Sequence, residues 1–186
     1  AGQSAEVLHT WGLVPQRFLA DISSSQPLVI ATACITPLTS LFLHELDWTH
    51  VVFNMVAFLL FAPAVEKRLG TRRFVALYLI TGLAANAFFL AMVADGKFGS
   101  IGASAAVCGV LGAYMLLFFS TRWIKSLVPF ALLCLTVLGT QNPQNVEATG
   151  FTHWMHLAGF AVGAIAAGVL TVELTGARRP VTCVKV

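Results

Sequence analysis

Long apolar stretches separated by short polar connectors dominate this sequence from residue 49 to residue 174. A helix that crosses the roughly 30 Å hydrocarbon core of a bilayer needs about 20 residues. The candidate stretches are 49–69, 74–94, 101–120, 124–139 and 154–174, of which 124–139 is short. Only 10% of the 186 residues are charged, whereas soluble domains carry about 25%. The sequence therefore predicts an all-α polytopic membrane protein with five transmembrane helices.

Three regions follow from this pattern. Residues 1–48 mix polar and apolar side chains, and we predict an extracytoplasmic loop with short amphipathic or re-entrant helices. The stretch 28–43 within it contains Pro37 and is too short to span a bilayer comfortably. Residues 49–175 are predicted to be the transmembrane core, and 176–186 a cytoplasmic tail.

Basic residues lie on alternate connectors. Nine of the eleven Lys and Arg lie at or after the C-terminal ends of the first, third and fifth stretches: Lys67, Arg68, Arg72, Arg73, Arg122, Lys125, Arg178, Arg179 and Lys185. Positively charged connectors stay on the cytoplasmic side, so the other connectors are predicted to be extracytoplasmic. The first 45 residues then also lie outside, which predicts a further transmembrane helix upstream of residue 1.

Polar side chains within the spans gather at one depth. Such side chains are costly in a membrane and mark candidate functional sites. Counted at about 1.5 Å per residue from the basic cytoplasmic ends, Asn54, His50 and Ser104 lie roughly 20, 26 and 27 Å up. His156 lies two residues inside the outer end of the last span. All four are therefore predicted to share the outer third of the membrane.

Small residues accompany two of these side chains. Gly102, Ala103, Ala105 and Ala106 flank Ser104, and the sequence continues with Gly109 and Gly112. Gly159 and Gly163 follow His156 at small-xxx-small spacing. Small faces let membrane helices approach closely. The third and fifth spans are therefore predicted to pack together with Ser104 facing His156.

Each polar residue taken alone also has a structural explanation. A serine in a membrane helix commonly bonds its own backbone, a lone histidine can bond a neighbouring helix, and we expect Asn86 to bridge helices. A metal site is the other alternative, but no HExxH or similar signature is present, so we predict neither metal nor cofactor. The histidines considered for it are His44, His50, His153 and His156.

The motifs, taken in order, resemble those of the rhomboid intramembrane proteases. Residues 50–54 (His-Val-Val-Phe-Asn) are similar to their HxxxN motif, and 102–104 (Gly-Ala-Ser) to their GxS motif. His156, Gly159 and Gly163 match their HxxGxxxG motif. The stretches 11–15, 38–44 and 64–70 are similar to the family's first loop and second helix. Family members have a six-helix core, so the resemblance implies that the five spans are the second to the sixth.

The resemblance also implies a chemistry. Ser104 would be the nucleophile and His156 its general base, in a dyad without an acidic third member. The Ser104 backbone N–H would hold the oxyanion, with His50, Asn54 and Gly102 in the oxyanion and substrate-binding site. Residues 140–153 would form a lid and the short fourth span a lateral gate.

Three positions depart from the family pattern. Ala105 stands where the family usually has glycine, and Cys108 stands where an aromatic ring commonly packs against the histidine. The interval from His44 to His50 is one residue longer than usual. None of these changes removes a reacting group, but they bear on whether the dyad is competent.

The sequence therefore predicts one of two functions. The first is a serine endopeptidase that cleaves single-span transmembrane substrates near the extracytoplasmic face, in a bacterial inner membrane. The alternative is an inactive rhomboid-like protein that binds transmembrane clients or serves as a subunit of a membrane complex. A transporter or channel is disfavoured, because no internal repeat or line of ionisable residues crosses the membrane. The lipid bilayer is an expected partner, and nucleic acid is not.

Overall fold

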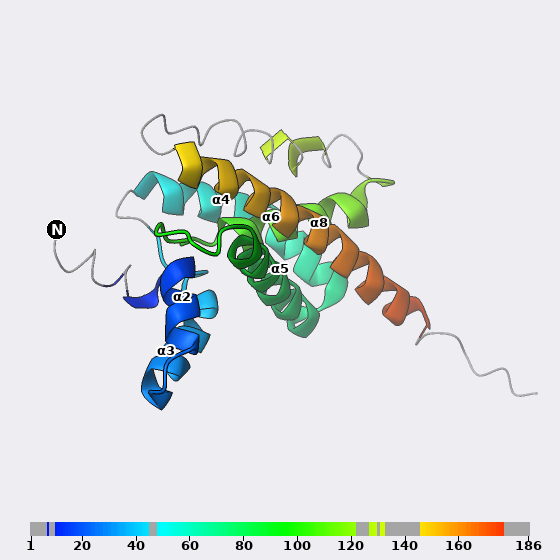
Figure 1. Cartoon of the computed structure of the whole chain (residues 1–186). Coiled ribbons are helices and arrows are strands. Elements are labelled where there is room, and N and C mark those ends of the chain that lie inside the picture. Colours follow the sequence, from blue (N-terminus) through cyan, green and yellow to red (C-terminus); the bar gives the residue numbers. More distant parts are fainter. Residues whose placement is uncertain are drawn as a thin grey trace, which may run out of the picture.

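Helices make up the regular structure of the described chain. The computed structural model describes residues 7, 10–44, 48–121, 127–129, 131–132 and 146–176. Within them, only an isolated two-residue bridge represents β-structure. The named helices, shown in Figure 1, are α2 (Pro15–Ile22), α3 (Pro27–Thr39), α4 (Trp48–Leu69), α5 (Thr71–Met92), α6 (Ser104–Phe118) and α8 (Val146–Gly176). The prediction of an all-helical chain is confirmed for these residues.

Three helices are long and apolar enough to cross a membrane. They contain the segments His50–Leu69, Thr71–Met92 and Phe151–Val172. Helix α6 has 15 residues and so reaches only about 22 Å, because it begins at Ser104 rather than at the predicted residue 101. Most of the predicted span 124–139 lies outside the described residues. The chain is thus an integral membrane protein, with three of the five expected helices described at spanning length.

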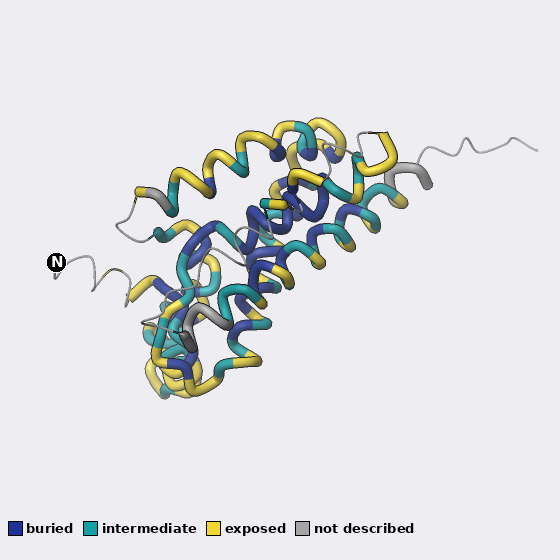
Figure 2. The backbone as a smooth tube through the Cα atoms, turned by 90° about the horizontal axis from the view of Figure 1, so that it is seen from above, coloured by how far each residue is buried: buried dark blue, intermediate teal, exposed yellow. Residues whose placement is uncertain are grey.

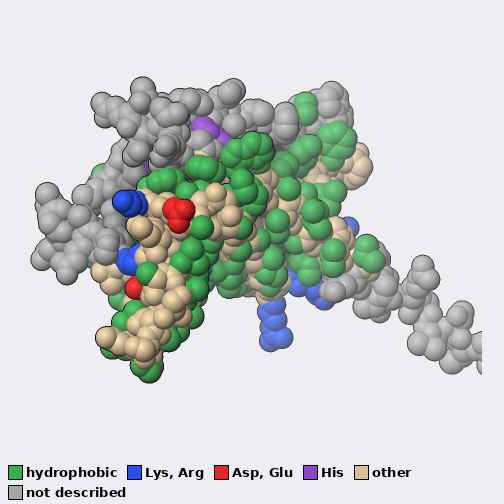
Figure 3. Space-filling model, viewed as in Figure 1, with side chains coloured by type: hydrophobic (Ala, Val, Ile, Leu, Met, Phe, Trp, Pro, Cys, Tyr) green, Lys and Arg blue, Asp and Glu red, His purple; other side chains and the backbone are tan. Residues whose placement is uncertain are grey.

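The short helix α6 is the centre of the bundle. Its residues Ala105–Tyr114 are all buried, and Figure 2 shows buried positions concentrated in the middle of the bundle. The longer helices around it carry large apolar side chains that are exposed on the outside of the bundle. Examples are Phe53 and Leu59 of α4 and Ile165 of α8. Hydrophobic side chains cover most of the bundle face in Figure 3. Such a surface suits contact with lipid tails.

Helices α6 and α8 touch backbone to backbone. A Cβ atom added at Gly159 would meet the carbonyl of Ala105, and one added at Gly163 would meet the carbonyl of Gly109. From the other side, a Cβ at Gly112 would meet the carbonyl of Phe160. These glycines therefore allow an approach that no other residue permits, which is the usual role of small residues between membrane helices.

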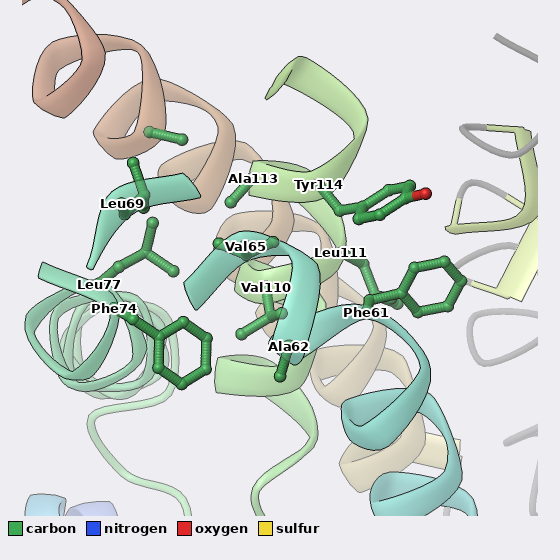
Figure 4. Close-up of a cluster of buried hydrophobic side chains, with 11 residues drawn as sticks. Phe61, Ala62, Val65, Leu69, Phe74, Leu77, Val110, Leu111, Ala113 and Tyr114 are labelled. Atoms are coloured by element: carbon green, nitrogen blue, oxygen red, sulfur yellow. The ribbon is translucent and has the colours of Figure 1, made fainter. Parts of the chain in front are cut away.

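A cluster of buried apolar side chains fills the end of the bundle away from Ser104. Figure 4 shows how residues from α4, α5 and α6 meet there, with the Phe61 and Tyr114 rings 4.9 Å apart in an edge-to-face arrangement. Its members are Phe61, Ala62, Val65, Leu69, Phe74, Leu77, Val110, Leu111, Ala113, Tyr114 and Ala167. The cluster fixes the helices that carry the candidate site.

The N-terminal segment is held against the loop that precedes α6. Leu13 and Ser100 exchange two backbone hydrogen bonds, of 3.2 and 2.8 Å, and Gln16 N–H donates to the carbonyl of Gly96 at 3.1 Å. Prolines start both short helices, at Pro15 and Pro27, where a missing N–H costs nothing. Through its main chain, this segment therefore reaches the end of the bundle at which α6 begins.

One helix boundary differs clearly from the prediction. Helix α8 begins at Val146, eight residues before the predicted start at Trp154. Residues 146–153 are therefore helical rather than part of a lid loop, and 140–145 lie outside the described residues. The prediction used the limit of hydrophobicity, whereas a helix continues wherever its backbone hydrogen bonds do, in lipid or in water. His156 is accordingly well inside α8 rather than near its start.

Candidate active site

The structure brings Ser104 and His156 together. Ser104 is the first residue of α6, and its Oγ lies 2.8 Å from Nε2 of His156 on α8. His156 and Gly159 are three residues apart and so share one face of α8. The close contact between Gly159 and the Ala105 carbonyl therefore also positions the imidazole of His156 beside Ser104. Only 3% of His156 is exposed.

The second imidazole nitrogen has a different environment. Nδ1 of His156 is buried and has no hydrogen-bond partner among the described residues. If the Ser104 hydroxyl donates to Nε2, the ring proton must lie on Nδ1. A carboxylate at Nδ1 is what defines a Ser-His-Asp triad. The described residues therefore form a serine-histidine pair, and they contain no group of three or more potential metal ligands.

Helix α4 brings two further polar side chains to the same end of the bundle. His50 and Asn54 are four residues apart and so lie on one face of α4. A Cβ added at Gly102 would lie 3.0 Å from Cε1 of His50 and 3.8 Å from Oγ of Ser104. His50 and Ser104 therefore flank the same glycine, which has a φ of 116° that side-chain-bearing residues rarely adopt.

Asn54 is hydrogen-bonded to His44, for which no catalytic role is predicted from the sequence. Its Nδ2 lies 3.3 Å from Nε2 of His44, and the His44 ring meets the His50 ring edge-on at 5.4 Å. His44 thus contacts both side chains of the HxxxN motif. Its position six residues before His50 was visible in the sequence, but nothing in that spacing indicated which side chain it would bond.

The start of α6 supplies hydrogen-bond donors beside the serine. The first N–H groups of a helix have no partner within it, and here the first regular bond runs from Val107 N–H to the carbonyl of Ala103 at 2.9 Å. Among the described residues, the N–H of Ser104 is thus one of the donors without a backbone partner, next to its own hydroxyl. The partial positive charge of a helix N-terminus favours an anion at this point.

The two unusual neighbours of Ser104 have distinct settings. The methyl group of Ala105 belongs to a second buried cluster, the outer cluster, formed by Leu13, Ala85, Phe89, Ala105 and Met155. Among the described residues only glycines have positive φ, so Ala105 is an ordinary helical residue. Cys108 is buried one turn further along α6. The methyl group of Ala105 is therefore accommodated in an ordinary helical backbone.

Comparison with known proteins gives one family. Residues 32–173 match the model of the rhomboid domain. The chain is 34% identical over 106 residues to "Putative rhomboid protease YdcA" of Bacillus subtilis, covering 52% of each protein. It is 34% identical over 100 residues to "Presenilin-associated rhomboid-like protein A, mitochondrial" of Danio rerio, covering 53% of this chain and 26% of that protein.

A plant relative extends the match. "RHOMBOID-like protein 4" of Arabidopsis thaliana is 28% identical over 124 residues, which are 67% of this chain and 31% of that protein. The chain thus spans about a quarter to a half of the length of the relatives it matches. No solved structure matches it significantly.

Proposed function

The chain belongs to the rhomboid family, and from that premise we propose that it is an intramembrane serine endopeptidase. The observation that carries the proposal is the 2.8 Å separation between Ser104 Oγ and His156 Nε2. A nucleophile and its general base must lie within about 2.6–3.2 Å of each other. The pair meets this condition without any movement of either helix.

The reaction follows from this arrangement. Ser104 Oγ attacks the scissile carbonyl carbon while its proton moves to Nε2 of His156. Nε2 then returns that proton to the leaving amine as the carbon–nitrogen bond breaks, which leaves an acyl-enzyme. Water, deprotonated by the same nitrogen, hydrolyses the ester and regenerates the hydroxyl. His156 thus serves both as base and as acid.

The oxyanion is held at the start of α6. The Ser104 N–H, at the positive end of the helix, is one donor for the negative charge that develops on the substrate oxygen. His50 lies against Gly102 on the same side and is the second. Asn54, positioned by His44, is the third. Removing one such donor typically costs about 3–4 kcal/mol of transition-state stabilisation.

The position of the pair defines the substrate class. A peptide bond within a helix keeps its carbonyl in the backbone hydrogen bonds, so the substrate must unwind to be cut. We propose single-span membrane proteins with small or helix-breaking residues near the outer membrane face. The basic residues Lys67, Arg68, Arg72 and Arg73 support an orientation in which the opposite end of the bundle faces the cytoplasm. The site then opens to the extracytoplasmic side, in a bacterial inner membrane.

A fluorophosphonate probe tests the proposal directly, because it reacts only with an activated serine. We expect the folded wild-type protein in detergent to be labelled, and labelling to be lost in Ser104→Ala and His156→Ala. Cleavage of a single-span substrate in proteoliposomes should fall at least about 10³-fold in both. Ser120→Ala is the matched control, since Ser120 is exposed beyond the other end of α6.

The buried Cys108 favours a second candidate function. It occupies the position from which an aromatic ring would help to orient His156, and the Nδ1 atom of His156 has no described partner. A rhomboid-like protein that binds transmembrane clients without cutting them would tolerate both features. Folded wild-type protein that neither labels nor cleaves would favour this function over the protease.

A further inference from the structure

A single buried amide connects three parts of the chain beside the candidate active site. Asn86 of α5 is 1% exposed. Its Nδ2 donates to the carbonyl of Pro37 at 2.7 Å and to Oγ of Ser40 at 3.0 Å. Its Oδ1 accepts from the hydroxyl of Ser100 at 3.4 Å. Both the NH2 group and the oxygen of the Asn86 amide are thus hydrogen-bonded, to partners at least 14 residues away in the sequence.

The first of these bonds closes the end of α3. The last carbonyls of a helix have no partner within it, and that of Pro37 lies in the final turn of α3, which ends at Thr39. Leu41 N–H, which would bond Pro37 in a longer helix, donates to Leu38 instead. Asn86 therefore caps α3 from a different helix, together with the Ser40 hydroxyl, which donates to the same carbonyl at 3.1 Å.

Residue 40 in turn holds the turn before the nucleophile. The backbone carbonyl of Ser40 accepts the N–H of Gly102 at 2.9 Å. Gly102 is the residue flanked by the His50 ring and by the Ser104 hydroxyl. Two hydrogen bonds thus lead from Asn86, through the end of α3, to the backbone two residues before Ser104.

The third bond reaches the same loop from its other side. Ser100 lies four residues before Ser104, and its hydroxyl also lies 3.7 Å from Sδ of Met155, the neighbour of His156. Its backbone is paired with Leu13. The loop 100–103 is therefore connected to Asn86 at two points. Ser100 bonds Asn86 directly, and Gly102 bonds Ser40, which Asn86 also contacts.

We infer that Asn86 is a positioning residue for the oxyanion site, acting through Ser40 and Ser100 on the loop that precedes Ser104. The inference rests on the proposed function. Asn86 touches neither reacting group, but a misplacement of about 1 Å in a catalytic group can cost 100-fold in rate. Loss of Asn86 therefore lowers transition-state stabilisation more than substrate binding.

The test compares two isosteric changes on α5. Asn86→Leu removes all three hydrogen bonds and keeps the branching and the number of side-chain heavy atoms. Thr81→Val is the control, because Thr81 is equally buried and, among the described residues, its hydroxyl bonds within α5, to the carbonyl of Tyr78 at 3.0 Å. We expect Asn86→Leu to lower kcat for a transmembrane substrate by about 10- to 100-fold, with KM within twofold of wild type.

A transition-state analogue gives an independent readout. A peptide aldehyde forms a hemiacetal with the serine, and its dissociation constant should rise in Asn86→Leu by the same factor by which kcat/KM falls. Thr81→Val should change none of these values more than twofold. A merely structural role for Asn86 would instead lower the fraction of active protein and leave the kcat of the labelled fraction unchanged.

The outcomes separate this inference from the proposed function. If wild-type protein neither labels nor cleaves, the protease proposal fails and this inference falls with it. If wild type is active and folded Asn86→Leu retains its kcat, or if Thr81→Val loses as much, the inference alone is overturned. Should Asn86→Leu not fold, Ser40→Ala removes two hydrogen bonds of the network, those that its hydroxyl makes with Asn86 and with the Pro37 carbonyl, and an unchanged kcat in that variant overturns the inference equally.

Discussion

His44 is the residue whose role depends most on the three-dimensional structure. It lies before α4, yet it bonds Asn54 and meets the ring of His50. The HxxxN motif alone gives the two residues on the helix and does not show what orients the amide of Asn54. An amide can present either its oxygen or its nitrogen, so an orienting partner decides whether it can donate to an oxyanion.

Replacing His44 should therefore lower catalysis indirectly, because the amide of Asn54 loses the partner that orients it. We expect His44→Ala to lower kcat/KM by about three- to tenfold, the value of one hydrogen bond. In Asn54→Ala, which has already lost the amide, His44→Ala should add less than a twofold further loss. Cleavage rates for the two single variants and the double variant measure this coupling. Fully additive losses would show that His44 acts independently of Asn54.

The neighbour of the nucleophile permits a prediction about stability. Ala105 is a helical residue whose methyl belongs to the outer cluster. Ala105→Gly, which restores the residue usual in the family, should therefore destabilise the protein. Glycine costs about 1 kcal/mol relative to alanine within a helix, and the lost methyl contact adds to this. Thermal unfolding in detergent measures the change, and a higher melting temperature in the variant would contradict this explanation.

At the scale of helices, the contact between α6 and α8 determines whether a site exists. Gly163 faces the Gly109 carbonyl at backbone distance, so even a methyl group cannot enter without separating the helices. We expect Gly163→Ala to destabilise the fold by about 1–3 kcal/mol and to lower fluorophosphonate labelling more than tenfold. Unfolding and labelling should be measured together on the same preparation.

Gly168 provides the matched control on the same helix. A Cβ at this position would lie 3.3 Å from Cδ2 of Leu116, the end of a flexible side chain. Gly168→Ala should therefore be tolerated, with a small gain from the higher helix propensity of alanine. Equal losses of stability and labelling in Gly163→Ala and Gly168→Ala would rule out the specific helix contact as their cause.

Helix limits are predictable from the sequence where the hydrophobic pattern and the helix end at the same residues. The limits of α4 and α5 fall within three residues of those predicted, because both helices end close to where their apolar stretches end. Helices α6 and α8 differ because α6 begins inside the apolar stretch and α8 begins outside it. The meeting of Ser104 with His156 was predictable from motif order and small residues. The bonds of Asn86 and His44 were not, since they depend on irregular loops.

For the whole molecule, the orientation in the membrane is the property to test. The charge pattern predicts that the turn between α2 and α3 is extracytoplasmic and that the turn between α4 and α5 is cytoplasmic. Ser25 and Arg72 are exposed at these turns. In a background with Cys34, Cys134 and Cys183 changed to serine, Ser25→Cys should react with an impermeant maleimide in right-side-out vesicles.

The second cysteine position is the control for the first. Arg72→Cys should react only in inverted vesicles, while the buried Cys108 remains unmodified in both. Labelling of both positions from one side would overturn the proposed orientation. Labelling of Arg72→Cys in right-side-out vesicles alone would mean that the dyad opens to the cytoplasm.

The central place of α6 also bears on how the protein is made. The helix is too short to cross a bilayer alone, and its closest backbone contacts are with α8, which the ribosome synthesises later. Under the proposed function, Ser104 therefore lies in the membrane without its general base, His156, until α8 has been inserted. A nascent chain that lacks α8 consequently has no activated serine, and biosynthesis itself delays the onset of any cutting until α8 is in place.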